Sequence, residues 1–305
     1  MARSSAVAPP VPPLTDLVLP WFDAQARDLP WRRAETTPWG VMVSEFMLQQ
    51  TPVARVEPVW TRWMAEWPLP SSLAAAPRAE VLRAWGKLGY PRRALRLHEA
   101  ARVIATEHDD VVPSDVDVLE SLPGVGSYTA RAVAAFAYRR RCPVVDTNVR
   151  RVVARAVHGR GDAGPVRARA DLADVEALLP ADEATAARLS AALMELGAVV
   201  CTARNPRCEL CPARRTCAWQ AAGRPAYTGP RRPPQGYAGT DRQVRGKLLD
   251  VLREAPAPVE KVVLDAVWSN AAQRDRCLDS LLVDGLAEQL ADGRFSLGCT
   301  PVSGE

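Results

Sequence analysis

The chain has 305 residues, 48% of them hydrophobic and 24% charged, with a formal net charge of +4 at pH 7. A chain of this length and apolar content is expected to fold around one or two substantial cores, and so small a net charge does not by itself indicate a nucleic-acid partner. No apolar run is as long as a membrane span, and residues 1–13 lack the apolar core of a signal peptide. We therefore expect a cytoplasmic protein with a disordered tail at 1–13, no membrane partner, and seven cysteines that are reduced or bound to metal.

Two segments near the N-terminus carry candidate site residues. Trp31 and Arg32 follow a predicted helix, and the tryptophan would either stack on a base or pack in the core. Thr37 and Pro38 are typical of a helix start, and Glu45 lies in that helix among valines, methionines and a phenylalanine. A buried carboxyl group tends to take up a proton, which is what a general acid requires. The alternative is that Glu45 lies on a polar stripe of the helix.

Further helical spacing over 53–112 is interrupted at 87–93, a segment with one tyrosine and three cations. An exposed loop of this composition suits contact with a DNA backbone, or a wedge between bases. A plain connection between helices is the alternative.

Around Gly124 the sequence predicts two short helices joined by the turn LPGVG, with Ser114 as a candidate cap of the first helix. Gly124 and Gly126 admit positive φ, so the N–H groups of this turn, with Val125 between them, are expected to form an anion site suited to a phosphate. A Rossmann turn would need a preceding strand and a third glycine, and neither is present. A turn without a ligand remains the alternative.

An apolar run then leads into Asp146, which starts a helix that contains Asn148. Asp146 is either a helix cap or a carboxylate directed at the same place as the turn. Arginines are frequent around both features, and we expect them to neutralise phosphates, with a solvated surface as the alternative. They are Arg139, Arg140, Arg141, Arg150, Arg151 and Arg155.

Four cysteines follow at the spacing C-x6-C-x2-C-x5-C: Cys201, Cys208, Cys211 and Cys217. In a reducing compartment such a set indicates a bound metal, and four thiolates suit either zinc or an iron–sulfur cluster. Glu195, just before them, is a second carboxylate among apolar residues.

The segment 221–241 is rich in proline, glycine and arginine and is predicted to be a linker. Three helices are predicted after it, at 242–252, 259–267 and 271–286, with a hairpin at 287–297 that turns at Asp292 and Gly293. This order predicts a small winged-helix-like module at 242–300, with either DNA or a protein as its partner.

The LPGVG turn, the aspartate of VVDTNV and the four-cysteine set together resemble the endonuclease III-type, helix-hairpin-helix superfamily of DNA repair glycosylases. Within it, the segments VSEFMLQQT and MELG resemble the adenine-specific mismatch glycosylase (MutY) family. The resemblance implies an all-α, two-lobed catalytic core at 14–220. A six-helix barrel would occupy about 37–141, and a lobe formed by 14–36 and 142–220 would hold a [4Fe-4S] cluster on the four cysteines.

The resemblance also implies an activity, the hydrolysis of the N-glycosidic bond of a flipped adenine mispaired with 8-oxoguanine or guanine in double-stranded DNA. Glu45 would protonate adenine at N7, and Asp146 would stabilise an oxocarbenium-like sugar, with Asn148 and Tyr128 beside it. The adenine pocket would be lined by Trp31, Arg32 and Glu195. The gap and the opposing base would be met by Gln50, Thr51, Leu88 and Tyr90. The phosphate would be bound by Gly124, Val125 and Gly126.

One position separates the chain from the bifunctional relatives of its superfamily, and the chain departs from the MutY pattern after the linker and at Pro91, which replaces an aromatic residue common after Tyr90. Tyr128 stands where bifunctional relatives carry a Schiff-base lysine, so we expect a monofunctional enzyme without efficient strand cleavage. The residues after the linker are too few for the Nudix-like domain common in the family, so recognition of 8-oxoguanine would rest on the barrel. We expect a monomer associated with the nucleoid.

Two other functions fit parts of the pattern. A thymine or uracil mismatch glycosylase of the same fold would not need an N7 acid at Glu45. A non-catalytic DNA-binding protein with a four-cysteine zinc site would leave Glu45, Asp146 and Glu195 unexplained.

Overall fold

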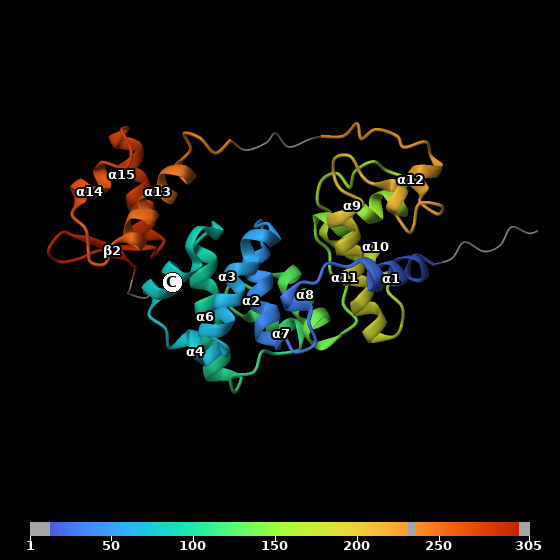
Figure 1. Cartoon of the computed structure of the whole chain (residues 1–305), viewed down its shortest axis with the longest axis horizontal. Helices are drawn as coiled ribbons and strands as arrows, with labels where there is room; N and C mark the ends of the chain where they lie inside the picture. The colour runs from blue at the N-terminus through green and yellow to red at the C-terminus, as the bar shows by residue number, and fades with distance from the viewer. Residues whose placement is uncertain (1–12, 231–235, 299–305) are drawn as a thin grey trace, which may run out of the picture. The chain divides into compact units, whose positions relative to one another are not determined.

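The computed structural model of the chain describes residues 13–230 and 236–298, and these are mainly helical (Figure 1). They divide into two compact units. The first unit combines the residues up to Asp28 with those from Ala130 to the gap at 231–235, and the second combines Leu29–Thr129 with the residues after that gap. The predicted tail at 1–13 falls almost entirely outside the described residues, and the predicted linker does so in part. No helix in the described part of the chain has both the length and the apolar composition needed to cross a bilayer.

The second unit begins with a set of helices in chain order. These are η1 (Pro30–Arg32), α2 (Pro38–Leu48), α3 (Val53–Glu66), α4 (Pro70–Ala74), α5 (Arg78–Trp85), η2 (Gly86–Leu88), α6 (Arg92–Glu107), α7 (Val116–Ser121) and α8 (Ser127–Tyr138), the last of which continues into the first unit. The helix α2 packs against η1, α3 and α6. It therefore joins η1 and α3 to α6.

The start of α2 follows from its sequence. The Thr37 side chain accepts a hydrogen bond from the Gly40 N–H at 3.2 Å, and Pro38 occupies the first helical position. A Cβ at Gly40 would lie 3.2 Å from the Trp60 ring and 3.3 Å from the Met64 sulfur, so glycine favours the close approach of α3 that lets the Trp60 indole donate to the Gly40 carbonyl at 2.8 Å. Every residue from Trp39 to Met47 is buried. A helix that is buried all round has no polar stripe, so that alternative for Glu45 is wrong.

Tryptophans fill the core beside α2. The Trp63 ring meets Trp67 and Trp85 edge to face, with ring centroids 4.8 and 5.6 Å apart. Trp31 packs in the same manner against Trp60 at 5.9 Å and is only 7% exposed. Trp31 is thus held in place by its ring contact with Trp60.

The first unit is built around α11 (Glu183–Val199), which packs against α1 (Leu14–Gln25) and α9 (Thr147–Ala156). Valines, leucines and alanines from these three helices form its core. Gly197 lies where α11 meets α9, and a Cβ there would come within 2.7 Å of the Asn148 Cβ and 2.8 Å of the Asn148 carbonyl oxygen. The remaining elements are α10 (Ala168–Glu176), η3 (Cys208–Leu210) and α12 (Ala218–Ala221).

The C-terminal residues form α13 (Asp241–Glu254), α14 (Lys261–Asp265), α15 (Ala271–Val283) and an antiparallel pair, β1 (Ala287–Gln289) and β2 (Phe295–Leu297). This is the predicted order of three helices and a hairpin. The middle helix is shorter than predicted because Val259 instead forms a bridge with Phe295 of β2.

Candidate active site and nucleic-acid interface

Glu45 lies in the middle of α2 and is 5% exposed. Its neighbours along the helix, Val41, Met42 and Phe46, are buried as well. The carboxyl group is thus buried beside apolar side chains of its own helix, as a proton donor shielded from water would be.

Arg93 fixes the C-terminal end of that helix. Its Nη1 donates to the carbonyl oxygens of Phe46 at 2.7 Å and Gln49 at 2.6 Å, and its Nη2 donates to the Thr51 hydroxyl and the Gly89 carbonyl at 3.0 Å. A guanidinium in this position satisfies carbonyls that a helix end leaves without partners. Burial lowers the pKa of Arg93 to about 10, which leaves it charged at neutral pH. The sequence had placed Arg93 in an exposed loop, and that interpretation is wrong because the side chain is directed inward.

The four residues expected to meet the opposing base lie on the two segments that Arg93 joins. Gln50 has a φ of +58° and Tyr90 a φ of +47°, a backbone region that few residues other than glycine adopt. The Thr51 hydroxyl donates to the Leu88 carbonyl at 3.0 Å, so the two segments are also joined directly. Tyr90 is 44% exposed, whereas Leu88 and Thr51 are buried.

The turn between α7 and α8 uses its two glycines differently. Gly124 has a φ of +77°, and a Cβ there would come within 2.6 Å of the Arg96 side chain. Gly126 does not have positive φ, so the expectation of left-handed backbone at both glycines is wrong. A Cβ at Gly126 would meet nothing within 4 Å, so this face of the turn is open to a ligand. The first helix is capped by Asp115, which accepts from the N–H groups of two following residues, and not by Ser114.

Of the three N–H groups predicted to bind phosphate, that of Val125 is already used. It donates to the Leu122 carbonyl at 3.1 Å, and the Val125 side chain is buried. The anion site at this turn would therefore depend on Gly126 and on the first turn of α8, where Tyr128 lies.

Asp146 caps α9, and both of its carboxylate oxygens are engaged. One accepts from the Val149 N–H and the other from the Asn148 side-chain amide, each at 2.7 Å. Asn148 in turn accepts from Arg151 at 2.7 Å, and Arg151 also donates to the carbonyl oxygens of Gly197 and Cys201 at 2.7 Å. The orientation of Asp146 is thus set by Asn148, and that of Asn148 by Arg151.

The surroundings act on the Asp146 carboxyl in opposite directions. Burial raises its pKa, while the hydrogen bonds from Val149 and Asn148 and the charge of Arg151 lower it, and burial prevails. The Asp146 carboxylate is therefore a largely buried charge. A carboxylate in such a place acts strongly on a positive charge that develops nearby.

Glu195 is completely buried in α11 and pairs with Arg27, the residue that follows α1 and Ala26. The Arg27 Nε and Nη2 donate to its two oxygens at 2.6 and 2.8 Å. This bidentate pair raises the pKa of Arg27. Arg27 had no distinguishing signal in the sequence, because its partner is 168 residues away.

The expected arginine surface is largely absent. Arg150 and Asp171 form a buried ion pair at 2.8 Å, and Arg155 is 5% exposed, with its guanidinium over the Trp219 ring at 4.8 Å. Arg141 donates to Glu176 and to the Pro180 carbonyl, and Arg151 is held as described above. Of the six, only Arg139 and Arg140 keep the predicted exposure.

The four cysteines line one cavity of the first unit, together with Arg155 and Trp219. Burial raises the pKa of Cys201, and that of Cys211 to about 11, so these thiols become thiolates only beside a positive charge, such as a bound metal supplies. Among the described residues no set of three or more His, Cys, Asp or Glu side chains is arranged to hold a metal ion. Four thiols around a cavity fit a larger group better than a single ion.

The candidate residues fall into both units. Glu45, Trp31, Arg32, the Gln50 and Leu88 segments and the hairpin turn belong to the second unit, and Asp146, Asn148, Glu195 and the cysteines belong to the first.

The sequence matches a known protein family. Residues 43–177 match the HhH-GPD superfamily of base excision DNA repair proteins. Over 92% of the chain and 94% of the relative, the sequence is 66% identical to an adenine DNA glycosylase of Mycolicibacterium smegmatis. The chain belongs to the adenine DNA glycosylase family.

Other members of the family match over a shorter part. The human adenine DNA glycosylase is 40% identical over 66% of this chain and 38% of its own length. As a member of the family the chain is a DNA glycosylase with a helix-hairpin-helix fold.

Solved structures support the same fold. A thermostable thymine-DNA glycosylase aligns with a TM-score of 0.60 and 26% identity, covering 68% of this chain and 95% of that one. A trapped endonuclease III–DNA covalent intermediate aligns with a TM-score of 0.58 and 22% identity, covering 68% of this chain and 94% of that one.

Proposed function

We propose that the chain removes adenine mispaired with 8-oxoguanine or guanine from double-stranded DNA, as a monomer. The observation that carries the proposal is the fixed arrangement Asp146–Asn148–Arg151, because it holds a carboxylate in a largely dry place within an adenine DNA glycosylase sequence. A carboxylate held in this way is suited to a cationic transition state.

The reaction begins on the base. Glu45 gives its proton to N7 of the flipped adenine, and the electrons of the glycosidic bond move into the base as the bond to C1′ breaks. Protonation turns adenine into a better leaving group, and the buried position of Glu45 keeps water from competing for the proton.

The sugar then carries positive charge, which Asp146 stabilises as a carboxylate. A water molecule adds to C1′ and loses a proton, so the products are free adenine and an abasic site. Asn148 keeps the Asp146 carboxylate in place through the 2.7 Å hydrogen bond, and Tyr128 lies beside the reaction without taking a proton.

Strand cleavage is not part of the proposed reaction. A β-elimination through a Schiff base needs an amine nucleophile, and Tyr128 occupies the position that supplies one in bifunctional relatives. Release of adenine should therefore precede any strand break, which would then require alkali.

The DNA contacts follow from the same assignment. We assign contacts with the flipped adenine to Trp31, Arg32 and Glu195, of which Glu195 is held by Arg27. The gap left by the extruded base and the opposing base are met by Gln50, Thr51, Leu88 and Tyr90. Extrusion of a base costs a few kcal/mol in lost stacking, and the contacts of these residues offset that cost. The turn at Gly124, Val125 and Gly126, with the start of α8, contacts a phosphate.

Cys201, Cys208, Cys211 and Cys217 would hold a [4Fe-4S] cluster, in the cavity that they share with Arg155. The Arg155 Nη1 lies 3.5 Å from the Cys201 Sγ, and a buried cation there complements the negative charge of ligated thiolates. The cluster would supply local structure to the segment after α11. The predicted boundaries 14–220 for the catalytic core and 242–300 for the C-terminal module are part of the same proposal.

Single-turnover excision on a duplex with adenine opposite 8-oxoguanine tests the proposal. Glu45→Gln should abolish release of adenine and keep duplex binding, because the substitution removes the proton but not the shape. Asp146→Asn should do likewise. Near-normal turnover in either variant would refute the assigned role.

A further inference from the structure

The charge of the C-terminal module is not that of an independent DNA-binding module. From Asp241 to Gly298 they contain eight basic and ten acidic residues, a net charge of −2. Several of the basic side chains are paired inside the module, among them Arg276 with Asp241 at 3.0 Å and Arg274 with Asp265 at 3.0 Å. The helix α15 therefore offers little free positive charge to a phosphate backbone.

The module contacts instead the loop that precedes α6, within the second unit. Asp250 of α13 lies 3.6 Å from the Lys87 ammonium, and Asp284 lies 3.4 Å from Arg92. Arg242 donates to the Tyr90 hydroxyl at 3.3 Å. The acidic side chains of the module thus meet cations on both sides of Tyr90.

A more buried contact lies just before this loop. The Arg253 Nε donates to the Leu82 carbonyl of α5 at 3.2 Å, and the Arg253 side chain is only 11% exposed. Burial lowers the pKa of Arg253, while Asp250 opposes this shift. The strand β2 also packs against α5. Exposed ion pairs contribute little by themselves, so this buried contact is the main anchor.

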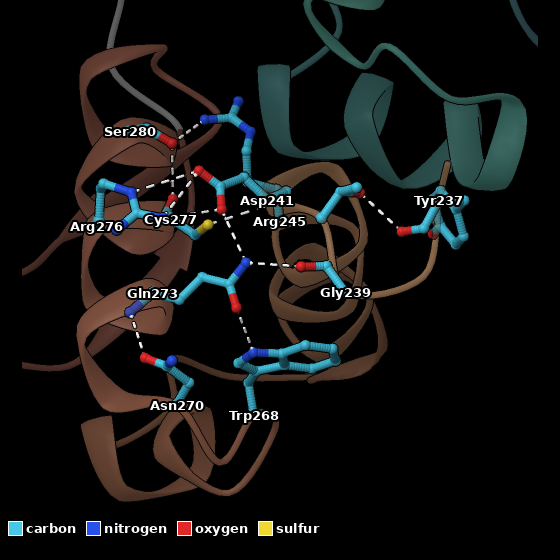
Figure 2. Close-up of polar contacts among 11 residues, drawn as sticks. Tyr237, Gly239, Asp241, Arg245, Trp268, Asn270, Gln273, Arg276, Cys277 and Ser280 are labelled. Atoms are coloured by element: carbon cyan, nitrogen blue, oxygen red, sulfur yellow. Dashed lines mark hydrogen bonds and ion pairs between the residues drawn. The ribbon is translucent and has the colours of Figure 1, made fainter. Parts of the chain in front are cut away.

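Hydrogen bonds inside the module hold the residues that contact the loop. Figure 2 shows Gln273 of α15 between Asp241, Gly239 and the Trp268 indole, with hydrogen bonds of 2.9, 3.0 and 2.8 Å. Arg245 of α13 is bound to Ser280 of α15 in the same network. The first turn of α13, with Arg242, is therefore fixed to the body of the module.

We infer that the C-terminal module braces the loop Gly86–Pro91 and thereby sets how well the enzyme discriminates between bases opposite the adenine. Thr51 and Arg93 hold the Leu88 and Gly89 carbonyls of the loop, but the Lys87 side chain is 75% exposed and Tyr90 is 44% exposed. The contacts of Lys87 and Tyr90 with the module therefore add a second support on the outer side of the loop. The discrimination part rests on the proposed function, since it takes Leu88 and Tyr90 as the residues that meet the opposing base.

The test uses the full chain with Asp250→Asn and Arg253→Met together. The matched control is Asp265→Asn with Arg294→Met, because these residues form ion pairs inside the module and none with the loop. Single-turnover excision is measured with adenine opposite 8-oxoguanine and opposite guanine. Hydrogen exchange of peptides that cover residues 86–91 and thermal unfolding are measured on the same variants.

The brace predicts faster exchange in the loop and a change of about fivefold in the ratio of the two excision rates, with the control like the original chain in both. Unchanged exchange in the loop would overturn the inference, and so would faster exchange with an unchanged ratio. If the original chain excises adenine from neither duplex, the proposed function fails with the discrimination, while the exchange data still decide whether the module braces the loop.

Discussion

The orientation of the Asp146 carboxylate depends mainly on one side chain, that of Asn148. The Asn148 amide is its only side-chain hydrogen-bond donor among the described residues, and Arg151 fixes that amide from behind. Since burial raises the pKa of Asp146 and this hydrogen bond lowers it, Asn148 helps to keep the carboxylate ionised.

This balance predicts a shift in the pH dependence of excision. The proposed reaction needs the carboxylate form of Asp146, so its rate should fall as the pH is lowered through the pKa of this group. Asn148→Ala removes a contribution that lowers this pKa, so the acidic limb should move to higher pH. Single-turnover rates between pH 4 and 9 on one duplex, at roughly constant salt, measure the limb. An acidic limb that stays in place, or moves to lower pH, would contradict the role of Asn148.

The stability of the fold should respond to the same carboxyl group in a defined direction. A raised pKa in the folded state means that the folded chain binds a proton more readily than the unfolded chain. The contribution of Asp146 to the free energy of unfolding therefore falls as the pH rises from the usual aspartate range through the raised value.

At the level of elements, two contacts that are distant in sequence place the proposed catalytic groups. Gly197 allows α11 to touch the backbone of α9 at Asn148, and Arg93 joins the end of α2 to the Thr51 and Gly89 segments. Each contact connects residues that are more than forty positions apart.

Gly197→Ala should separate α11 from α9, because the added Cβ would lie 2.7 Å from Asn148. We expect a loss of about 1–3 kcal/mol in the free energy of unfolding, as for other overpacked sites, and a lower excision rate. Denaturant unfolding and single-turnover assays measure both. Gly246→Ala is the matched control, since it lies within α13 and its Cβ would meet only the Tyr237 hydroxyl, at 3.5 Å. Equal effects of the two substitutions would rule out the close contact as the cause.

Arg93→Lys should destabilise the second unit, although the charge is kept. A lysine ammonium cannot reach the same set of acceptors, so carbonyl oxygens at the end of α2 lose their donors, at a cost of about 1–3 kcal/mol. Thermal unfolding measures this loss. Arg102→Lys, on the exposed face of α6, should leave the unfolding temperature nearly unchanged. If Arg93→Lys behaves like this control, the bonds made by Arg93 are not what holds the segments together.

For the whole molecule, local signals predicted the helices well. The cap at Thr37, the proline after it and the apolar run to Met47 define α2, and the order of three helices and a hairpin near the C-terminus is confirmed. The predicted cap at Ser114 and the predicted ends of α14 differ from the structure by only one or two residues. These differences arise because Asp115 is the better acceptor for the helix N–H groups and because Val259 pairs with Phe295.

What the sequence did not reveal depends on pairs that are distant along the chain. Arg27 carried no signal in the sequence, and Arg93 and Arg155 were expected at a DNA-facing surface, yet each is held by partners from another segment. An arginine-rich composition gives no indication of which guanidinium groups turn inward, so the predicted phosphate-binding surface was too large. The contacts of the C-terminal module with Lys87 and Arg92 were hidden for the same reason.

The proposed cluster site also depends on contacts that are distant along the chain, because the four cysteines line a cavity that forms where the segment after α11 packs on α9. The chain purified without oxygen should contain about four iron atoms and an equal amount of acid-labile sulfide. Cys211→Ser should lower the iron content and the thermal stability together. One zinc ion per chain and no iron would contradict the cluster.

We propose that Glu45 protonates N7 of an adenine whose sugar is stabilised by Asp146. Single-turnover excision of 7-deazaadenine opposite 8-oxoguanine tests this proton transfer, because this base keeps the shape of adenine and has a carbon in place of N7. The chain should bind this duplex as it binds the adenine duplex and release no base. Release of 7-deazaadenine at a rate close to that of adenine would show that Glu45 does not act on N7.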